Sequence, residues 1–238
     1  MANVSSNGPS AVIFDMDGVL LDSNDTWEAV MGELFALAGK SLSDLDQDSF
    51  MGGDNSLQWA AFLRQLLGLE MTDEEIVQWV VDRMNVRYNS HLPLIPGAVD
   101  VVARLASQFP LGLASSSPRE VIHLVLRRSG MDDLFQVWVS SDDVACGKPA
   151  PDVFLLCCER LGVEPARCAA VEDSRVGIRS AKAAGLRVIA VPGLVFPLDA
   201  ETLALADAVI SSIDELEPEF ARSLMDVGSE ASDGASGI

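Results

Sequence analysis

The sequence predicts an α/β protein: a doubly wound parallel sheet with an all-α unit inserted after its first strand. From about Pro96 onward, short apolar strands alternate with helical segments. This rhythm is typical of a parallel sheet with right-handed helical crossovers. The stretch from about Asn24 to His91 has no such alternation and repeats apolar residues at helical spacing only. A third observation is that segments rich in polar and acidic residues stand where strands should end.

The core elements are expected in a fixed chain order. The apolar run 11–14 predicts the first strand, buried and followed at once by an acidic residue. After the helical insertion we expect a helix at 99–107, a strand at 111–114, a helix at 118–129, a strand at 135–139, a helix at 151–161, a strand at 168–171, a helix at 176–184, and strands at 188–191 and 208–210. Ligands of such sheets bind beyond the carboxyl ends of the strands.

The inserted unit is predicted to be helical from three apolar stripes, whose plain interpretation is core packing. Thr72 and Glu75 predict a capping box at the start of its last helix. The stripes are Trp27, Val30, Met31, Leu34 and Phe35; Trp59, Phe62, Leu63, Leu66 and Leu67; and Ile76, Val77, Val80, Val81 and Met84. A unit inserted directly after the first strand would cover the strand ends as a lid.

These patterns give an expected domain division. Residues 10–23 and 96–217 form the core domain, and residues 24–95 form the helical cap. Residues 218–238 form a C-terminal tail, which is small, polar and acidic toward its end and is therefore expected to be disordered there.

Composition excludes several classes of protein. The chain has 238 residues, 49% of them hydrophobic, which is ample for a buried core. Its formal net charge of −20 argues against nucleic acid and against an anionic membrane surface, because both are bound through clustered Lys and Arg. The ordinary interpretation of this charge is solubility. The sequence does not predict an oligomeric state.

Cysteine spacing and the N-terminus bear on the compartment. The four cysteines show no Cys-x-x-Cys spacing, so a zinc site is not expected, and Cys157 and Cys158 are interpreted as buried thiols in a reducing compartment. The polar first ten residues lack the pattern of a signal peptide, and no apolar stretch approaches the ~18 residues of a membrane span. We expect a cytoplasmic protein.

The first segment with chemical character is Asp15-Met16-Asp17-Gly18, directly after the strand at 11–14. Two carboxylates two residues apart can divide the roles of nucleophile and acid/base. A calcium loop would need Gly at its sixth position and Glu at its twelfth, where this chain has Leu20 and Thr26. A plain strand-to-helix turn remains the alternative for this segment taken alone.

The second segment is Ser115-Ser116-Ser117-Pro118, after the strand at 111–114. Ser117 is expected to cap the following helix, with Glu120 completing a capping box. The Ser115 hydroxyl and the Ser116 amide then form a phosphate cradle at the helix start.

The third and fourth segments supply a cation and two more acids. Lys148 is held by flanking prolines before a helix start, where a cation is otherwise disfavoured, so we expect it to point at a phosphate or at Asp15. Glu172 and Asp173 follow the strand at 168–171. They are either acids at a helix N-terminus or oxygen ligands for Mg²⁺.

One fold brings all four segments to one rim, because each follows a strand. Four acids with one lysine give a charge of about −3, and like charges ~4 Å apart cost about 4 kcal/mol at an effective dielectric of 20. A phosphorylated substrate therefore needs a divalent cation, and Mg²⁺ suits an all-oxygen site.

With all four motifs in order, the chain resembles the haloacid dehalogenase superfamily, in its phosphatase and phosphomutase branch with a helical cap. The resemblance covers about residues 10–217 and includes Ala183-Ala184-Gly185. It implies that Asp15 is the nucleophile and that Asp17 protonates the leaving oxygen and then activates water. Ser115, Ser116 and Lys148 would bind the phosphate. Asp173 would ligate Mg²⁺ together with Asp15 and the Asp17 carbonyl, with Glu172 in support.

The resemblance leaves three functions to weigh. The leading one is a Mg²⁺-dependent phosphatase for a small phosphorylated metabolite, a sugar or polyol phosphate. A hexose phosphomutase of the β-phosphoglucomutase type is the alternative enzyme. Such members carry a His and a cap-loop Arg where this chain has Trp27 and Gly52-Gly53-Asp54-Asn55, and we do not expect Trp27 to act on Asp17 as a His could. A non-catalytic binding protein would be expected to have lost Asp15, Asp17 or Lys148, and none is lost.

Overall fold

The computed structural model describes residues 11–44, 55–193 and 197–226. Its centre is a six-stranded sheet in which every neighbouring pair of strands is parallel, in the order β3-β2-β1-β4-β5-β6. The strands are β1 (Ala11–Phe14), β2 (Leu111–Ser115), β3 (Val137–Ser140), β4 (Cys168–Glu172), β5 (Arg187–Ala190) and β6 (Ala208–Val209). The order reverses at β1, as in a doubly wound sheet, and this confirms the predicted fold class.

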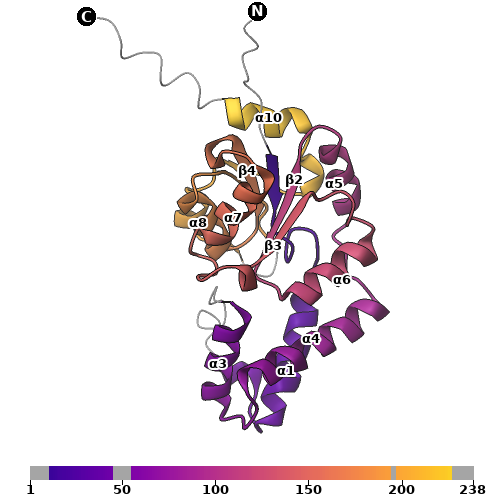
Figure 1. Ribbon diagram of the computed structural model, residues 1–238, viewed down its shortest axis with the longest axis vertical. Coiled ribbons are helices and arrows are strands. Elements are labelled where there is room, and N and C mark those ends of the chain that lie inside the picture. The colour runs from indigo at the N-terminus through magenta and orange to yellow at the C-terminus, as the bar shows by residue number, and fades with distance from the viewer. Residues whose placement is uncertain (1–10, 45–54, 194–196, 227–238) are drawn as a thin grey trace, which may run out of the picture.

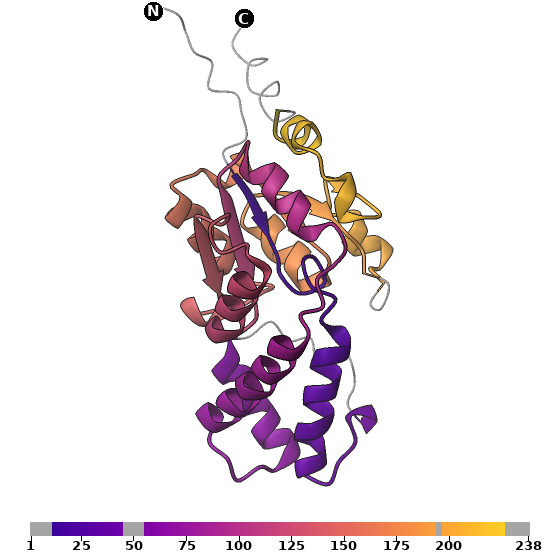
Figure 2. The same ribbon diagram turned by 90° about the vertical axis from the view of Figure 1, so that its right-hand side faces the viewer.

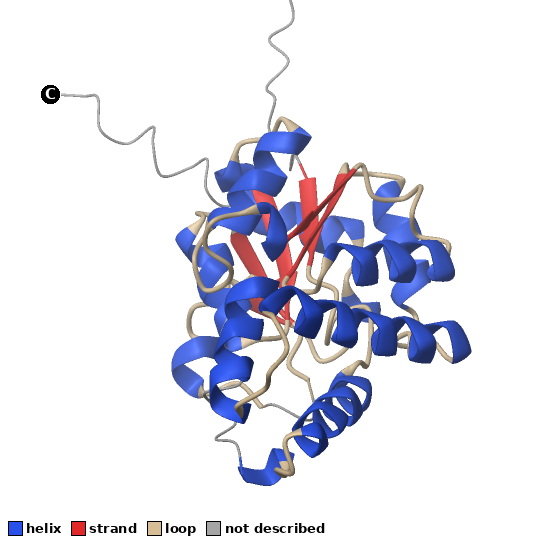
Figure 3. Cartoon of the chain, turned by 60° about the horizontal axis from the view of Figure 1, so that its bottom comes forward, coloured by secondary structure: helices blue, strands red, loops and turns tan. Residues whose placement is uncertain are grey.

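Buried hydrophobic clusters cover both faces of the sheet. A strand such as β1 contributes to both clusters, because its side chains alternate between the two faces. Val12 and Phe14 belong to one buried hydrophobic cluster, whereas Ala11 and Ile13 belong to a second. Helices lie around the sheet in Figure 3. They are α5 (Ala98–Ala106), α6 (Arg119–Ser129), α7 (Asp152–Leu161), α8 (Arg175–Ala183), α9 (Ala200–Leu203) and α10 (Pro218–Asp226).

Three helices lie together beyond the end of the sheet toward which β1 runs (Figures 1 and 2). They are α1 (Asn24–Leu37), α3 (Ser56–Leu67) and α4 (Asp73–Ser90). The predicted capping box is confirmed: Thr72 Oγ1 accepts from the Glu75 amide (3.2 Å), and the Glu75 carboxylate accepts from the Thr72 amide (2.8 Å). We call these helices the cap.

Hydrogen bonds join the cap to the core in addition to the chain connections, and two of them involve α3 and α4. The Ser56 amide, at the start of α3, donates to Asp142 Oδ1 at 2.8 Å. Asp142 belongs to the short 3₁₀ turn η2 (Ser141–Asp143) after β3. On the other side, Arg128 of α6 donates to the Asn89 carbonyl of α4 at 3.1 Å. These two bonds hold α3 and α4 against the core.

The structure differs from the expectations mainly at element ends. The strand expected at 135–139 begins at Val137, because Phe135 instead packs edge-on against Phe14 with ring centroids 6.0 Å apart. The expected tail begins with helix α10, and the predicted disorder at its end lies outside the described residues. Among the residues that the structure describes, no helix is long and apolar enough to cross a membrane.

Candidate active site

Lys148 is the centre of a buried cluster at the carboxyl ends of β1, β2 and β4. Its ammonium group donates to Asp15 Oδ1 (2.5 Å), to Glu172 Oε1 (2.6 Å) and to the Ala114 carbonyl (2.9 Å). An ammonium group has three protons, so the geometry uses all of them. Of the two targets expected for Lys148, a phosphate or Asp15, the structure shows the contact with Asp15.

Burial and charge oppose each other at this lysine. The side chain is only 2% exposed, and burial alone would favour its neutral form. The carboxylates of Asp15 and Glu172 outweigh that effect and raise the pKa of Lys148 above its ordinary value. Lys148 is therefore a fixed cation that holds two carboxylates in place.

The carboxylates of the cluster are electrostatically crowded. Burial raises the pKa of Asp15 to about 7, with Lys148 opposing the rise and Glu172 and Asp17 adding to it. Burial and the neighbouring Glu172 and Asp15 likewise hold the pKa of Asp173 well above its ordinary value. Burial is the larger cause of both pKa shifts, and the excess of negative charge that the sequence indicated adds to it; a divalent cation would relieve that second contribution.

Glu172 is tied into the scaffold on both sides. One carboxylate oxygen accepts from Lys148, and the other accepts from the amides of Asp173 and Ser174 at 3.1 and 3.3 Å and from the Ser174 hydroxyl at 3.1 Å. A Cβ at Gly177 would lie 1.9 Å from Glu172 Oε1, so only glycine fits there. Glu172 thus orients both Lys148 and the start of α8.

Gly18 brings the first motif against the fourth. Its φ of +80° lies in the left-handed region, and a Cβ on it would stand 1.8 Å from Asp173 Oδ2. The loop that follows Asp15 therefore packs directly on the Asp173 carboxylate. Side-chain oxygens of Asp15, Glu172 and Asp173 lie within 4.8 Å of one another. An all-oxygen set of this size fits a hard cation such as Mg²⁺.

Asp17 is held apart from this cluster by two donors. Its Oδ2 accepts from the Ser117 hydroxyl at 2.7 Å, and its Oδ1 accepts from the Trp27 indole N–H at 3.2 Å. The expected helix cap at Ser117 is wrong: α6 has no side-chain cap, because the hydroxyl of Ser117 is used on Asp17 instead. The contact between Trp27 and Asp17 was not expected. Only the helical spacing of Trp27 was visible in the sequence, and it indicated packing.

The two serines of the predicted phosphate cradle differ in exposure: Ser115 is buried and Ser116 is exposed. The Ser115 side chain, 1% exposed, accepts the Ser117 amide at 3.0 Å. Ser116 follows at the exposed surface of the same loop. Of the cap loop compared with mutases, residues 52–54 lie outside the described residues, and Asn55 caps α3.

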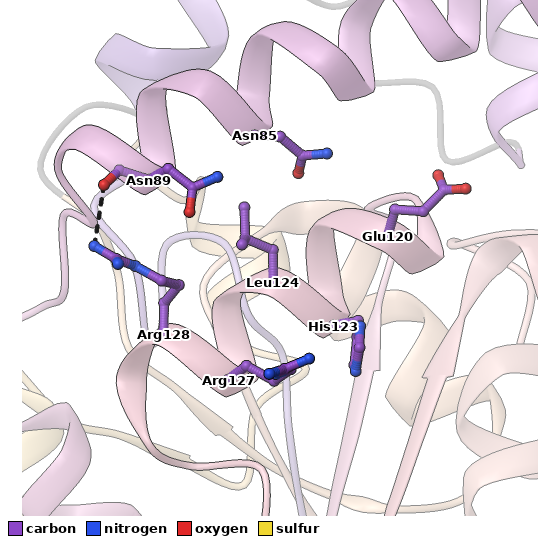
Figure 4. A pocket seen from close by; sticks show the side chains of 7 residues that line it. All are labelled: Asn85, Asn89, Glu120, His123, Leu124, Arg127 and Arg128. Atoms are coloured by element: carbon purple, nitrogen blue, oxygen red, sulfur yellow. Dashed lines mark hydrogen bonds between the residues drawn. The ribbon is translucent and has the colours of Figure 1, made fainter.

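A separate pocket of about 500 Å³ lies between α4 and α6 (Figure 4). Figure 4 shows Arg128 reaching across it to Asn89. Neither Asp15 nor Lys148 lines this pocket, whose walls are Asn85, Asn89, Glu120, His123, Leu124, Arg127 and Arg128. It is therefore distinct from the carboxylate cluster.

Comparison with known proteins agrees with this fold and site. The sequence model of the haloacid dehalogenase-like hydrolases matches residues 9–185. The chain belongs to that family and is one of its phosphomonoester hydrolases.

Individual relatives cover most of the chain. Hexitol phosphatase B of Escherichia coli K12 is 34% identical over 209 residues, which are 87% of this chain and 93% of the relative. Phosphorylated carbohydrates phosphatase of Thermotoga maritima is 32% identical over 201 residues, which are 84% of this chain and 92% of the relative. Among solved structures, CbbY of Rhodobacter sphaeroides in complex with xylulose-1,5-bisphosphate aligns with a TM-score of 0.74 at 27% identity, covering 87% of this chain and 96% of that one.

Proposed function

We propose that this chain is a Mg²⁺-dependent phosphatase that hydrolyses a small sugar or polyol phosphate through an aspartyl-phosphate on Asp15. The observation that carries the proposal is the division of the acids into two environments. Asp15 is buried and paired with Lys148, whereas Asp17 is held separately by Trp27 and Ser117. A nucleophile and an acid/base need this separation of roles.

In the first step, a carboxylate oxygen of Asp15 attacks the phosphorus atom, and the bond from phosphorus to the ester oxygen breaks. Asp17, in its acid form, gives its proton to that departing oxygen, which leaves as an alcohol. Lys148 favours the ionised form of Asp15 against the effect of burial and orients its carboxylate. The phosphoryl oxygens would lie against the loop of Ser115 and Ser116.

In the second step, Asp17 acts as the base. It takes a proton from a water molecule whose oxygen attacks the phosphorus atom. The bond between phosphorus and Asp15 breaks, inorganic phosphate leaves, and the Asp15 carboxylate and the Asp17 acid are restored. The same residue serves as acid and base because the two steps are chemically the reverse of each other at that proton.

Mg²⁺ would be held by Asp15 and Asp173, with the Asp17 carbonyl, and would neutralise the charge that otherwise repels a dianionic substrate. Glu172 is assigned a supporting part, because its oxygens already accept from Lys148, Asp173 and Ser174. These assignments are supported by the closeness of the three carboxylates and by the raised pKa of Asp15.

The substrate class is inferred from the relatives, which are named for hexitols and phosphorylated carbohydrates. We assign its recognition to the proposed cap domain, residues 24–95, above the proposed core of residues 10–23 and 96–217. The arrangement of α1, α3 and α4 at the strand ends supports that division (Figure 1).

The test is phosphate release from a panel of hexose and hexitol monophosphates with Mg²⁺. Asp15→Asn should abolish release, because an amide does not form the acyl-phosphate. Asp132→Asn, which changes an exposed core aspartate in the same way, is the matched control. Near wild-type turnover by Asp15→Asn, or full turnover of the wild type in excess chelator, would contradict the proposal.

One further assay separates a phosphatase from a mutase. The protein is incubated with β-glucose 1-phosphate, with and without the 1,6-bisphosphate, and glucose 6-phosphate and free phosphate are followed separately. We expect phosphate release that does not depend on the bisphosphate. Bisphosphate-dependent formation of glucose 6-phosphate with little phosphate release would favour the mutase.

A further inference from the structure

The acid/base carboxylate is bound by one donor from each part of the molecule. Ser117 stands in the core between β2 and α6, whereas Trp27 stands in the first turn of the cap helix α1. Each binds a different oxygen of Asp17, Ser117 at 2.7 Å and Trp27 at 3.2 Å. The orientation of the Asp17 carboxylate therefore depends on the cap as well as on the core.

Both contacts leave the carboxylate able to react. A carboxylate has about four acceptor positions, two on each oxygen. One donor on each oxygen fixes the plane of the group and leaves a position on each for the proton that is passed to the ester oxygen or taken from water. An indole N–H only donates, so Trp27 cannot itself remove or deliver that proton.

Trp27 is also held in place on its own side. It is half-buried, and its ring meets that of Trp59 of α3 edge to face, with centroids 6.4 Å apart and planes at 85°. The indole thus links the packing of two cap helices to one oxygen of Asp17. Core packing alone would not require its N–H to point at a carboxylate.

We infer that Trp27 is a positioning residue that aligns Asp17 for proton transfer when the cap lies against the core. The inference rests on the proposed phosphatase function. It assigns Trp27 no contact with the reacting atoms, because the residue acts through Asp17. Phosphoryl transfer to Asp15 itself would be largely insensitive to Trp27 when the departing group needs no proton.

The leaving group provides the readout. Trp27→Phe keeps an aromatic ring on Trp59 but loses the N–H. With Mg²⁺ and a hexitol 6-phosphate, whose alcohol must be protonated as it leaves, we expect kcat/KM, which reports the first step, to fall about tenfold, a part of the ~10²–10⁴-fold that acid–base catalysis contributes. With 4-nitrophenyl phosphate, whose leaving group departs as a stable anion, kcat/KM should change by less than about twofold.

Two comparisons separate this role from a structural one. Trp79→Phe changes another tryptophan of the same cap, which stacks on Arg83, and should affect neither ester. In an Asp17→Asn background, Trp27→Phe should cause no further loss on either ester, because a residue that acts through Asp17 has nothing left to align.

Equal losses by Trp27→Phe on both esters, no loss on either, or a loss that persists in the Asp17→Asn background would overturn the inference while the wild-type activity still supports the proposed function. A wild type that releases phosphate from neither ester would instead remove the proposed function, and the inference with it. The two failures are thus told apart by the wild-type rates.

Discussion

At the scale of single residues, the site is built from side chains whose partners are already satisfied inside the protein. Lys148 donates its three ammonium protons to Asp15, Glu172 and the Ala114 carbonyl. A buried lysine with unused protons would cost free energy. The cluster is therefore arranged before any ligand arrives. Its carboxylates outnumber its one ammonium group, so its net charge is negative.

Gly18 offers a test of how closely that arrangement is set. Gly18→Ala places a Cβ where Asp173 Oδ2 now lies, in addition to the strain of a positive φ. We expect phosphatase turnover to fall by about 10²-fold, since displacement of a catalytic group by about 1 Å has effects of this size. The measurement is kcat/KM as a function of Mg²⁺ concentration. We expect the variant to need a higher Mg²⁺ concentration to reach half of its maximal activity.

The matched control is Gly162→Ala, because Gly162 has a similar φ of +70° but open space around its Cβ position. Both variants should lose a similar amount of stability, about 1 kcal/mol, from the backbone alone. Only Gly18→Ala should lose activity. Equal activity losses would show that the contact with Asp173 is unimportant.

The sequence predicted those site residues whose positions follow from the chain. Asp15, Ser115 and Glu172 sit at strand ends, and parallel strands bring their ends to one edge. The parts played by Ser117 and Trp27 were not predicted, because a hydroxyl or an indole N–H has several possible acceptors. Which acceptor is used depends on how the cap lies on the core, and local sequence does not specify this.

At the scale of elements, the turn η2 shows how a short segment can couple the two parts. Asp143 fixes the turn by accepting from the Ser140 amide at 3.0 Å and from Arg119 at 2.7 Å. The neighbouring Asp142 is thereby presented to the first amide of α3, Ser56. An acceptor with negative charge is favourable at a helix N-terminus, where amides are unpaired.

Asp142→Ala should weaken the attachment of the cap at this point. Loss of a hydrogen bond to a charged acceptor is worth roughly 1.5–3 kcal/mol, which corresponds to about a 10- to 150-fold rise in KM if substrate binding requires the closed cap. Asp142→Asn keeps an acceptor oxygen and should stay close to wild type. Steady-state kinetics on a hexitol phosphate measure both.

Asp132→Ala serves as the control for this pair, since it removes the same charge from an exposed site on the core. An unchanged KM in Asp142→Ala would mean that the bond between η2 and α3 does not contribute to closure. A fall in kcat alone would point to the catalytic cluster instead.

Element order was predictable because alternation of strand and helix leaves a periodic pattern, but element ends were less so. The apolar run that predicted a strand from residue 135 includes Phe135, whose ring packs against Phe14 before the strand starts. Hydrophobic residues indicate burial, and burial alone does not distinguish a strand from the loop leading into it.

At the scale of the whole molecule, two electrostatic effects act together. The chain has a formal net charge of −20, so general repulsion opposes the compact state and any salt should reduce it. The crowding of Asp15, Glu172 and Asp173 is a separate, local repulsion, which a cation bound among them would relieve and a dilute salt would not. The two effects can be distinguished by comparing salts.

We expect Mg²⁺ to raise the melting temperature more than NaCl does at the same ionic strength, and the excess to grow with pH. The pKa of Asp15 is raised to about 7, above its unfolded value. Without metal, Asp15 therefore keeps its proton in the folded state at low pH. The folded state loses stability as the pH rises through about 7, where Asp15 becomes ionised. Mg²⁺ binds the ionised carboxylates, so it should restore the most stability at a pH above about 7, where Asp15 is ionised and the loss of stability is complete.

Thermal unfolding in matched NaCl and MgCl₂, at about pH 5.5 and about pH 8, measures both effects. Asp173→Asn should keep the response to NaCl, which acts on the whole charge, but lose the Mg²⁺ excess, because Asp173 is a proposed ligand of the cation. If the wild type responds identically to the two salts at both pH values, the carboxylate cluster does not bind Mg²⁺. If Asp173→Asn keeps the full excess, the cation binds elsewhere on this acidic molecule.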